Sequence, residues 1–139
     1  MKVLIDTNII LDLLCDRKGF SDNANQIFRL CEAGIVDGFV SALSIPNIVY
    51  ILRKELNTDR IREVVGLLDS LFTITDLTAR ELKLGVKMDF ADYEDALQCV
   101  SAKKSESKYI ITRNIKDYEN STIKAIAPSE FLKIIEADG

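Results

Sequence analysis

The chain of 139 residues carries 22 acidic and 18 basic side chains, for a formal net charge of −4, and 47% of its residues are hydrophobic. This composition is typical of one globular domain, and it excludes a disordered chain and a protein coated with basic residues for nucleic acid. Histidine is absent, which excludes serine–histidine and cysteine–histidine catalysis and histidine-ligated zinc, and leaves carboxylates, amides, hydroxyls, lysines or a bound hard cation to supply any chemistry.

The opening stretch is a short apolar run, Val3 to Ile5, that ends in Asp6, Thr7 and Asn8. A short continuous apolar run predicts a strand buried on both faces, and Thr7 and Asn8 are typical of the cap of a helix beginning near residue 9. Asp6 would then lie at the carboxyl end of a strand, where open α/β sheets bind ligands. The alternative is that Asp6 only helps to cap the helix.

Strands and helices alternate along the rest of the chain. We expect strands over residues 38–41, 71–75, 109–112 and 123–127. We expect helices to begin at Ser21, Leu77, Asp92 and Pro128, and two further helices to be capped by Ser44 and Thr58. Alternation of this kind favours an α/β fold, a three-layer α/β/α sandwich around a mainly parallel sheet, with residues 1–139 as a single domain.

The three cysteines are odd in number and have no C-x-x-C spacing, so we expect reduced, apolar side chains and no thiolate zinc site. No apolar run is long enough to span a bilayer, and the first one is interrupted by Asp6. We therefore expect a cytoplasmic protein with no membrane partner.

Acidic residues gather at the start of the helix expected at Asp92. At about 100° per residue, Asp92 and Asp95 lie on one flank of an apolar stripe that includes Tyr93, and Glu94 lies on the opposite flank, facing solvent. Asp92 and Asp95 could therefore point together into a cleft. The alternative is that acids in a first turn complement the helix dipole. Asp89 is expected to be a loop or cap acid.

A second buried strand ends in a polar cluster, Thr112, Arg113 and Asn114. If it neighbours the first strand where the chain order reverses, the two tips form the walls of one crevice, and the helix from Asp92 closes a third side. The alternative is a surface turn, which Asn and Asp favour.

Taken together, four segments resemble the PIN-domain ribonucleases, which include the VapC-type toxins of bacterial and archaeal toxin–antitoxin pairs. The segments are residues 3–8, 40–47, 92–97 and 110–118, in the family's order and spacing. The resemblance implies a strand order of 3-2-1-4-5 and hydrolysis of single-stranded or loop RNA by an acid cluster that uses Mg²⁺ or Mn²⁺. It also implies a homodimer and a small antitoxin protein as a partner.

Carried over to this sequence, the resemblance implies Asp6 and Asp95 as the primary metal anchors, with Asp92 as a further metal residue and Asp117 as a support. Two positions depart from the usual family pattern. Asn47 stands where a glutamate is usual, and Asn114 where the family often has the aspartate of Thr-x-Asp. An amide oxygen can contact a cation or its waters but adds no negative charge, so these residues would be neutral ligands.

Residues around the acids are expected to orient carboxylates or to contact substrate. We assign these roles to Asn8, Thr112, Arg113 and Lys116. Arg113 and Lys116 could contact RNA phosphate, or they could be solvated loop charges.

Two other functions remain open. The first keeps the fold without the chemistry: a weak or inactive PIN module that binds RNA or serves as a scaffold, because acids are missing. The second is a phosphoryl-transfer or receiver domain with an aspartate after its first strand. The second is disfavoured because Asn8 breaks an Asp-x-Asp pattern.

Overall fold

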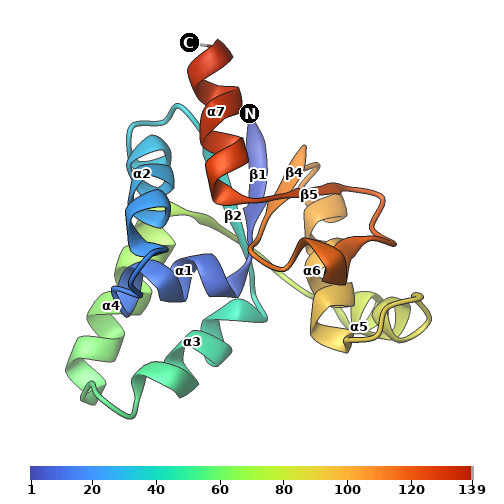
Figure 1. The fold of residues 1–139 in the computed structure, drawn as a ribbon. Coiled ribbons are helices and arrows are strands. Elements are labelled where there is room, and N and C mark those ends of the chain that lie inside the picture. The colour runs from blue at the N-terminus through green and yellow to red at the C-terminus, as the bar shows by residue number, and fades with distance from the viewer. Residues whose placement is uncertain (139) are drawn as a thin grey trace.

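A five-stranded parallel sheet lies at the centre of the computed structural model, which describes residues 1–138 (Figure 1). The strand order is β3-β2-β1-β4-β5, as predicted. The strands are β1 (Lys2–Ile5), β2 (Asp37–Ser41), β3 (Thr73–Thr75), β4 (Tyr109–Ile111) and β5 (Lys124–Ile126). Because β1 and β4 are neighbours, with Ile5 paired to Ile111, Asp6 and Thr112 follow adjacent strand ends.

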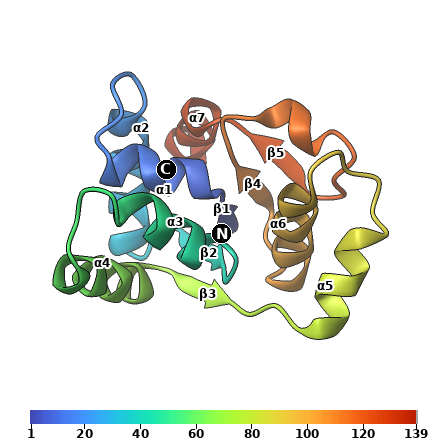
Figure 2. The same ribbon diagram turned by 90° about the horizontal axis from the view of Figure 1, so that it is seen from below.

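Helices cover both faces of the sheet. They are α1 (Thr7–Leu14), α2 (Ser21–Glu32), α3 (Ser44–Leu52), α4 (Thr58–Leu71), α5 (Ala79–Val86), α6 (Tyr93–Lys104), the 3₁₀ helix η1 (Ile115–Tyr118) and α7 (Pro128–Asp138). In Figure 2, α1 to α4 and α7 lie on one side of the sheet, whereas α5 and α6 lie on the other. No helix within residues 1–138 has the length and apolar character needed to cross a membrane.

The side chains of β1 show why the sheet needs cover on both faces. Val3, Leu4 and Ile5 are all fully buried. Alternate strand residues point to opposite faces, so Val3 and Ile5 join the core beneath α1, α2, α3 and α7, while Leu4 joins a smaller core with Ala102 of α6. The opening apolar run therefore fixes the central strand, and with it the position of Asp6.

Several helix starts differ from the prediction. Helix α1 begins at Thr7 rather than near residue 9, and Asp6 occupies its N-cap position without a capping hydrogen bond from its side chain. Helix α4 is capped by Asn57, not Thr58, because the Asn57 side chain accepts a hydrogen bond from the Arg60 amide. Ser44 lies inside α3 rather than before it. At α1 and α4 a neighbouring polar residue occupies the N-cap position, whereas at α3 that position is held by Leu43.

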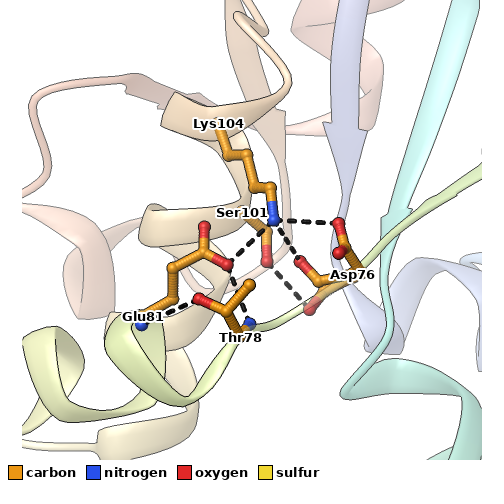
Figure 3. Close-up of polar contacts among 6 residues, drawn as sticks. Asp76, Thr78, Glu81, Ser101 and Lys104 are labelled. Carbon is orange, nitrogen blue, oxygen red and sulfur yellow. Dashed lines mark hydrogen bonds and ion pairs between the residues drawn. The ribbon is translucent and has the colours of Figure 1, made fainter.

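Helix α6 is held by contacts on several sides. Its residues from Ala96 to Ala102 are all buried, whereas Tyr93, expected on the buried face, is 44% exposed. At its other end, the Lys104 ammonium lies 2.8 Å from a carboxylate oxygen of Asp76 and 2.8 Å from one of Glu81 (Figure 3). These contacts join α6 to α5 and to the segment that precedes it, and so help to fix the helix that carries Asp95.

The start of α5 also differs from the prediction. The helix begins at Ala79, two residues after the expected Leu77, because Thr78 forms a capping box with Glu81. The same Glu81 carboxylate receives the Lys104 ammonium, so the helix cap and the ion pair share one acceptor (Figure 3).

The cysteines are free, as predicted. Cys31 and Cys99 are buried, but Cys15, at the end of α1, is exposed.

Candidate active site

A cleft of about 370 Å³ opens beyond the carboxyl ends of β1 and β4. Its walls come from the first turns of α1 and α6, from α3, and from the loop after β4. It is lined by Asp6, Thr7, Asn8, Leu11, Asn47, Tyr50, Ile51, Asp92, Glu94, Asp95, Gln98, Asn114 and Asp117. The cleft thus contains the four aspartates and both asparagines that the resemblance assigns to the acid cluster.

Asp6 and Asp95 meet at a buried tyrosine. The Tyr118 hydroxyl lies 3.3 Å from Asp6 Oδ2 and 3.3 Å from Asp95 Oδ1, so the two carboxylates are at most about two hydrogen-bond lengths apart. Thr112 Oγ1 donates a 2.7 Å hydrogen bond to the same oxygen of Asp6. Residues distant in sequence are therefore brought within reach of a single small ligand.

Asp92 combines two roles that the sequence left as alternatives. One of its carboxylate oxygens accepts hydrogen bonds from the amides of Glu94 (2.7 Å) and Asp95 (3.2 Å), which makes it the N-cap of α6. The residue also lines the cleft, together with Glu94. Glu94 is exposed to solvent, as expected, and it also stands at the cleft wall.

Burial and mutual repulsion keep protons on this cluster. The pKa of Asp95 rises from 3.8 to about 7, mainly through desolvation and then through the negative charges of Asp92, Asp6 and Asp117. Burial also raises the pKa of Asp6, against the opposing effect of its hydrogen bonds. The pKa of the Tyr118 hydroxyl is raised as well, by burial and by the two carboxylates, so it remains a hydrogen-bond donor. A cation in the cleft would relieve this repulsion.

Three of the neutral residues line the cleft, and a fourth lies behind it and supports a carboxylate. Asn47, Asn114 and Asn8 line the cleft. Thr112 is fully buried behind it, where its hydroxyl donates to Asp6 and accepts a 3.0 Å hydrogen bond from the Asn114 amide. Thr112 therefore orients Asp6 and the following loop, which is one of the two roles expected for it.

Arg113 and Lys116 do not line the cleft. The Arg113 guanidinium donates from Nε and Nη2 to the two carboxylate oxygens of Asp12, at 2.8 and 2.9 Å. Lys116 is exposed in η1. Of the residues after β4, Asn114 and Asp117 line the cleft, and the two cationic residues do not.

Sequence reasoning assigned no role to Gln98, which lines the cleft, or to Tyr118, whose hydroxyl contacts two of its carboxylates. Gln98 is 3% exposed, and its amide nitrogen donates to Ser44 Oγ (3.0 Å) and Thr7 Oγ1 (3.2 Å), which joins α6 to α3 and α1. Its carbonyl oxygen is the one buried side-chain polar atom in residues 1–138 without a hydrogen-bond partner. Gln98 follows Asp95 by three positions, so helical spacing alone could have placed it on the same face.

The donor set suits a hard divalent cation that keeps much of its water. Carboxylate and amide oxygens are the ligands that Mg²⁺ and Mn²⁺ prefer, and Mg²⁺ is commonly held by one or two carboxylates with water and phosphate. Within residues 1–138, no three acidic or cysteine side chains stand close enough to form a metal cage by themselves. The cleft therefore fits an ion held by Asp6 and Asp95 rather than one enclosed by protein.

Comparisons with known proteins agree with this geometry. The family model described as "PIN domain" matches residues 2–116. Ribonuclease VapC1 of Aquifex aeolicus (strain VF5) is 33% identical over 136 residues, covering 94% of this chain and 92% of that protein. Two solved structures share the fold. A toxin–antitoxin complex from Klebsiella pneumoniae matches with a TM-score of 0.66 and 21% identity over 91% of this chain and 97% of that chain. VapBC2 from Rickettsia felis, bound to a promoter DNA fragment, matches with a TM-score of 0.68 and 15% identity over 91% and 98%.

Proposed function

This chain belongs to the PIN-domain family, and we propose that it is a metal-dependent endoribonuclease that hydrolyses RNA phosphodiester bonds. The observation that carries the proposal is the contact of Asp6 and Asp95 through Tyr118 in an acid-lined cleft. Its support from sequence is the 33% identity to a ribonuclease over nearly the whole chain.

Asp6 and Asp95 would hold Mg²⁺ or Mn²⁺, with Asp92 and Asp117 beside them and the Asn47 and Asn114 amides as neutral ligands. When bound, such an ion polarises the phosphate, lowers the pKa of water and stabilises the leaving oxygen. The carboxylates draw the ion to the strand tips. Asn8 lies at the wall of the same cleft, where its amide can contact the substrate.

The protein groups must also be in the right protonation state. Asp95, whose pKa is raised to about 7, has to lose its proton before it can bind an ion as a charged carboxylate. Tyr118 and Thr112 hold the Asp6 carboxylate by hydrogen bonds, so its oxygens keep one direction while the charge in the cleft changes. We therefore expect activity to rise with pH through the neutral range.

We also propose that the protein is the toxin of a toxin–antitoxin pair, with a small antitoxin protein as a partner, and that it forms a homodimer. The support is the fold it shares with solved toxin–antitoxin complexes. A short upstream gene encoding a DNA-binding head and an amphipathic tail would provide the candidate. Co-expression should then give a stable complex that suppresses RNA cleavage, and independent migration of the two proteins would argue against the pairing.

A cleavage assay tests the nuclease proposal. Labelled single-stranded RNA is incubated with the protein and Mn²⁺ or Mg²⁺, with chelator in place of metal, and with Asp95→Asn. We expect metal-dependent cleavage that the variant loses. Cleavage that survives the chelator would identify a contaminating nuclease, and no cleavage with either ion would refute the proposal.

A second candidate is a PIN module that binds RNA or serves as a scaffold without cutting it. It is favoured by Asn47 at the usual glutamate position and by the lack of a three-acid cage in the described part of the chain. Such a module would bind labelled RNA equally well with metal and with chelator, and would leave it intact.

A further inference from the structure

Two exposed aromatic rings beside the cleft are each covered on one face by an arginine. The guanidinium carbon of Arg53 lies 4.1 Å from the ring centroid of Tyr50, and that of Arg113 lies 3.9 Å from the ring centroid of Phe20. Tyr50 is 55% exposed and Phe20 is 45% exposed. Both side chains are therefore accessible to a ligand at the protein surface.

Both rings are connected to the acid-lined cleft. Tyr50, on α3, is part of its wall. Phe20 and Arg113 line a second hollow of about 410 Å³, between the α1–α2 loop and the start of α7, and Asn114 borders both hollows. The two arginine–aromatic stacks thus belong to hollows that adjoin the carboxylates.

A buried aspartate holds the arginine of the Phe20 stack in place. Asp12, which is 1% exposed, binds Arg113 through two oxygens at 2.8 and 2.9 Å and receives Arg17 at 3.3 Å. The Arg113 guanidinium plane is therefore fixed, and the single negative charge of Asp12 is shared between Arg113 and Arg17. Arg113 can therefore support the Phe20 ring with a fixed guanidinium plane, and its contact with RNA phosphate stays a prediction.

The negative charge of the protein favours base stacking over phosphate contacts as a way of binding RNA. The chain has a net charge of −4, and the cleft is lined by aspartates, so electrostatic attraction for an RNA backbone is weak. Unpaired bases can instead be held by stacking on aromatic rings and guanidinium planes, an interaction that needs no net positive charge. The favoured ligand of these surfaces is therefore single-stranded RNA whose bases are free to stack.

We infer that Phe20 and Tyr50 are stacking platforms for unpaired bases on either side of the RNA bond that enters the acid cleft. The inference rests on the proposed ribonuclease function. It adds two residues that would bind the unpaired bases on either side of the cleaved bond.

The experiment uses the full chain with Mn²⁺. The cleavage site is first mapped on a single-stranded RNA, and oligonucleotides are then made with one abasic position at each of the three nucleotides before and after that site. The value of kcat/KM for each is compared with that for the intact RNA. The proteins are wild type, Phe20→Leu, Tyr50→Leu, the ring-keeping Phe20→Tyr and Tyr50→Phe, and Val86→Ala, which shortens an exposed side chain outside both hollows.

For wild type, we expect two sensitive positions in the RNA, one for each platform. An abasic nucleotide at either position should lower kcat/KM by about ten-fold, because a stacked base is lost. Each leucine variant should lose sensitivity at its own position and keep it at the other, and the ring-keeping variants should retain both. Val86→Ala should behave as wild type. Melting temperatures verify that all variants are folded.

The experiment separates failure of the proposed function from failure of the stacking inference. If wild type cleaves no RNA, the proposed function is overturned. If it cleaves RNA but the abasic penalties are the same in wild type and in both leucine variants, only the stacking inference is overturned, and the exposed rings would then be assigned to a protein partner.

Discussion

Replacing Asp95 by asparagine should stabilise the metal-free protein and abolish its response to metal. The wild-type carboxylate is forced to share the cleft with Asp92, Asp6 and Asp117, which together with burial raise its pKa from 3.8 to about 7. An amide removes the repulsion, and its oxygen can still accept the hydrogen bond from Tyr118. Removing an acid of the candidate site should thus raise the melting temperature.

The size of the effect depends on pH. Between pH 4 and 7 the unfolded chain has lost the Asp95 proton while the folded protein retains it, so the free energy of unfolding falls as pH rises. The full shift corresponds to ~4 kcal/mol at pH 8, and because the side chain is partly exposed to solvent we reduce this to about 2 kcal/mol. For a chain of this length that is a rise in Tm of roughly 5 °C for Asp95→Asn. The advantage should shrink at pH 5 and vanish near pH 4.

Thermal melts at pH 8 and pH 5, with chelator and with Mn²⁺, measure both effects. Wild type should gain stability with Mn²⁺, by roughly 3 kcal/mol at a hundred-fold excess over Kd, because the ion binds only the folded site. Asp95→Asn should gain little. Asp89→Asn, a matched change at an exposed acid outside the cleft, should follow wild type throughout. The reasoning fails if Asp95→Asn melts below wild type at pH 8 without metal, or if both respond equally to Mn²⁺.

Three further substitutions test the supports of the site. Tyr118→Phe removes a hydrogen bond that lowers the pKa of Asp95, so the acidic limb of the pH–rate profile for RNA cleavage should move to higher pH; an unmoved limb would contradict the contact. Thr112→Val deletes the 2.7 Å donor to a buried carboxylate and should lower the free energy of unfolding by about 1–3 kcal/mol in urea titrations, whereas Thr112→Ser should retain most of it. Gly38→Ala would place a Cβ atom 2.7 Å from Phe72 Cδ1 and should cost about 1–3 kcal/mol, yet the Mn²⁺-induced rise in Tm should persist; loss of that rise would mean that β2 packing reaches the site.

The fold was predictable because its strands are nearly pure hydrophobic runs. Burial of both faces leaves no polar alternation in β1 or β4, so each strand appears in the sequence as an apolar segment with a polar end. Helix starts were less predictable, since several neighbouring residues can serve as a cap. At α4, Asn57 and Thr58 are both suitable by residue type, and only the backbone conformation selects Asn57.

The site was predictable where it follows strand ends and helix spacing. Asp6, Asp92 and Asp95 were found by these two rules, and the structure places all three at one cleft. Tyr118 was recognised only as part of a family motif, because nothing in its local sequence indicates that a short 3₁₀ helix would turn its hydroxyl back towards β1. The pairing of Arg113 with Asp12 was not predictable for a similar reason: the two residues lie 101 positions apart, and no local pattern connects them.

The electrostatics of the cleft also give a physical meaning to its asparagines. With four aspartates present, one carboxyl already has a pKa of about 7, so a further acid at Asn47 or Asn114 would be partly protonated or would destabilise the metal-free protein. Amides avoid that cost and still offer oxygen ligands, but they attract a cation less strongly. An ion held by few charges relies on other ligands, and the phosphate of a bound RNA is the obvious one. Stacking platforms that hold the bases would bring that phosphate to the acids, so RNA binding and ion binding would each strengthen the other.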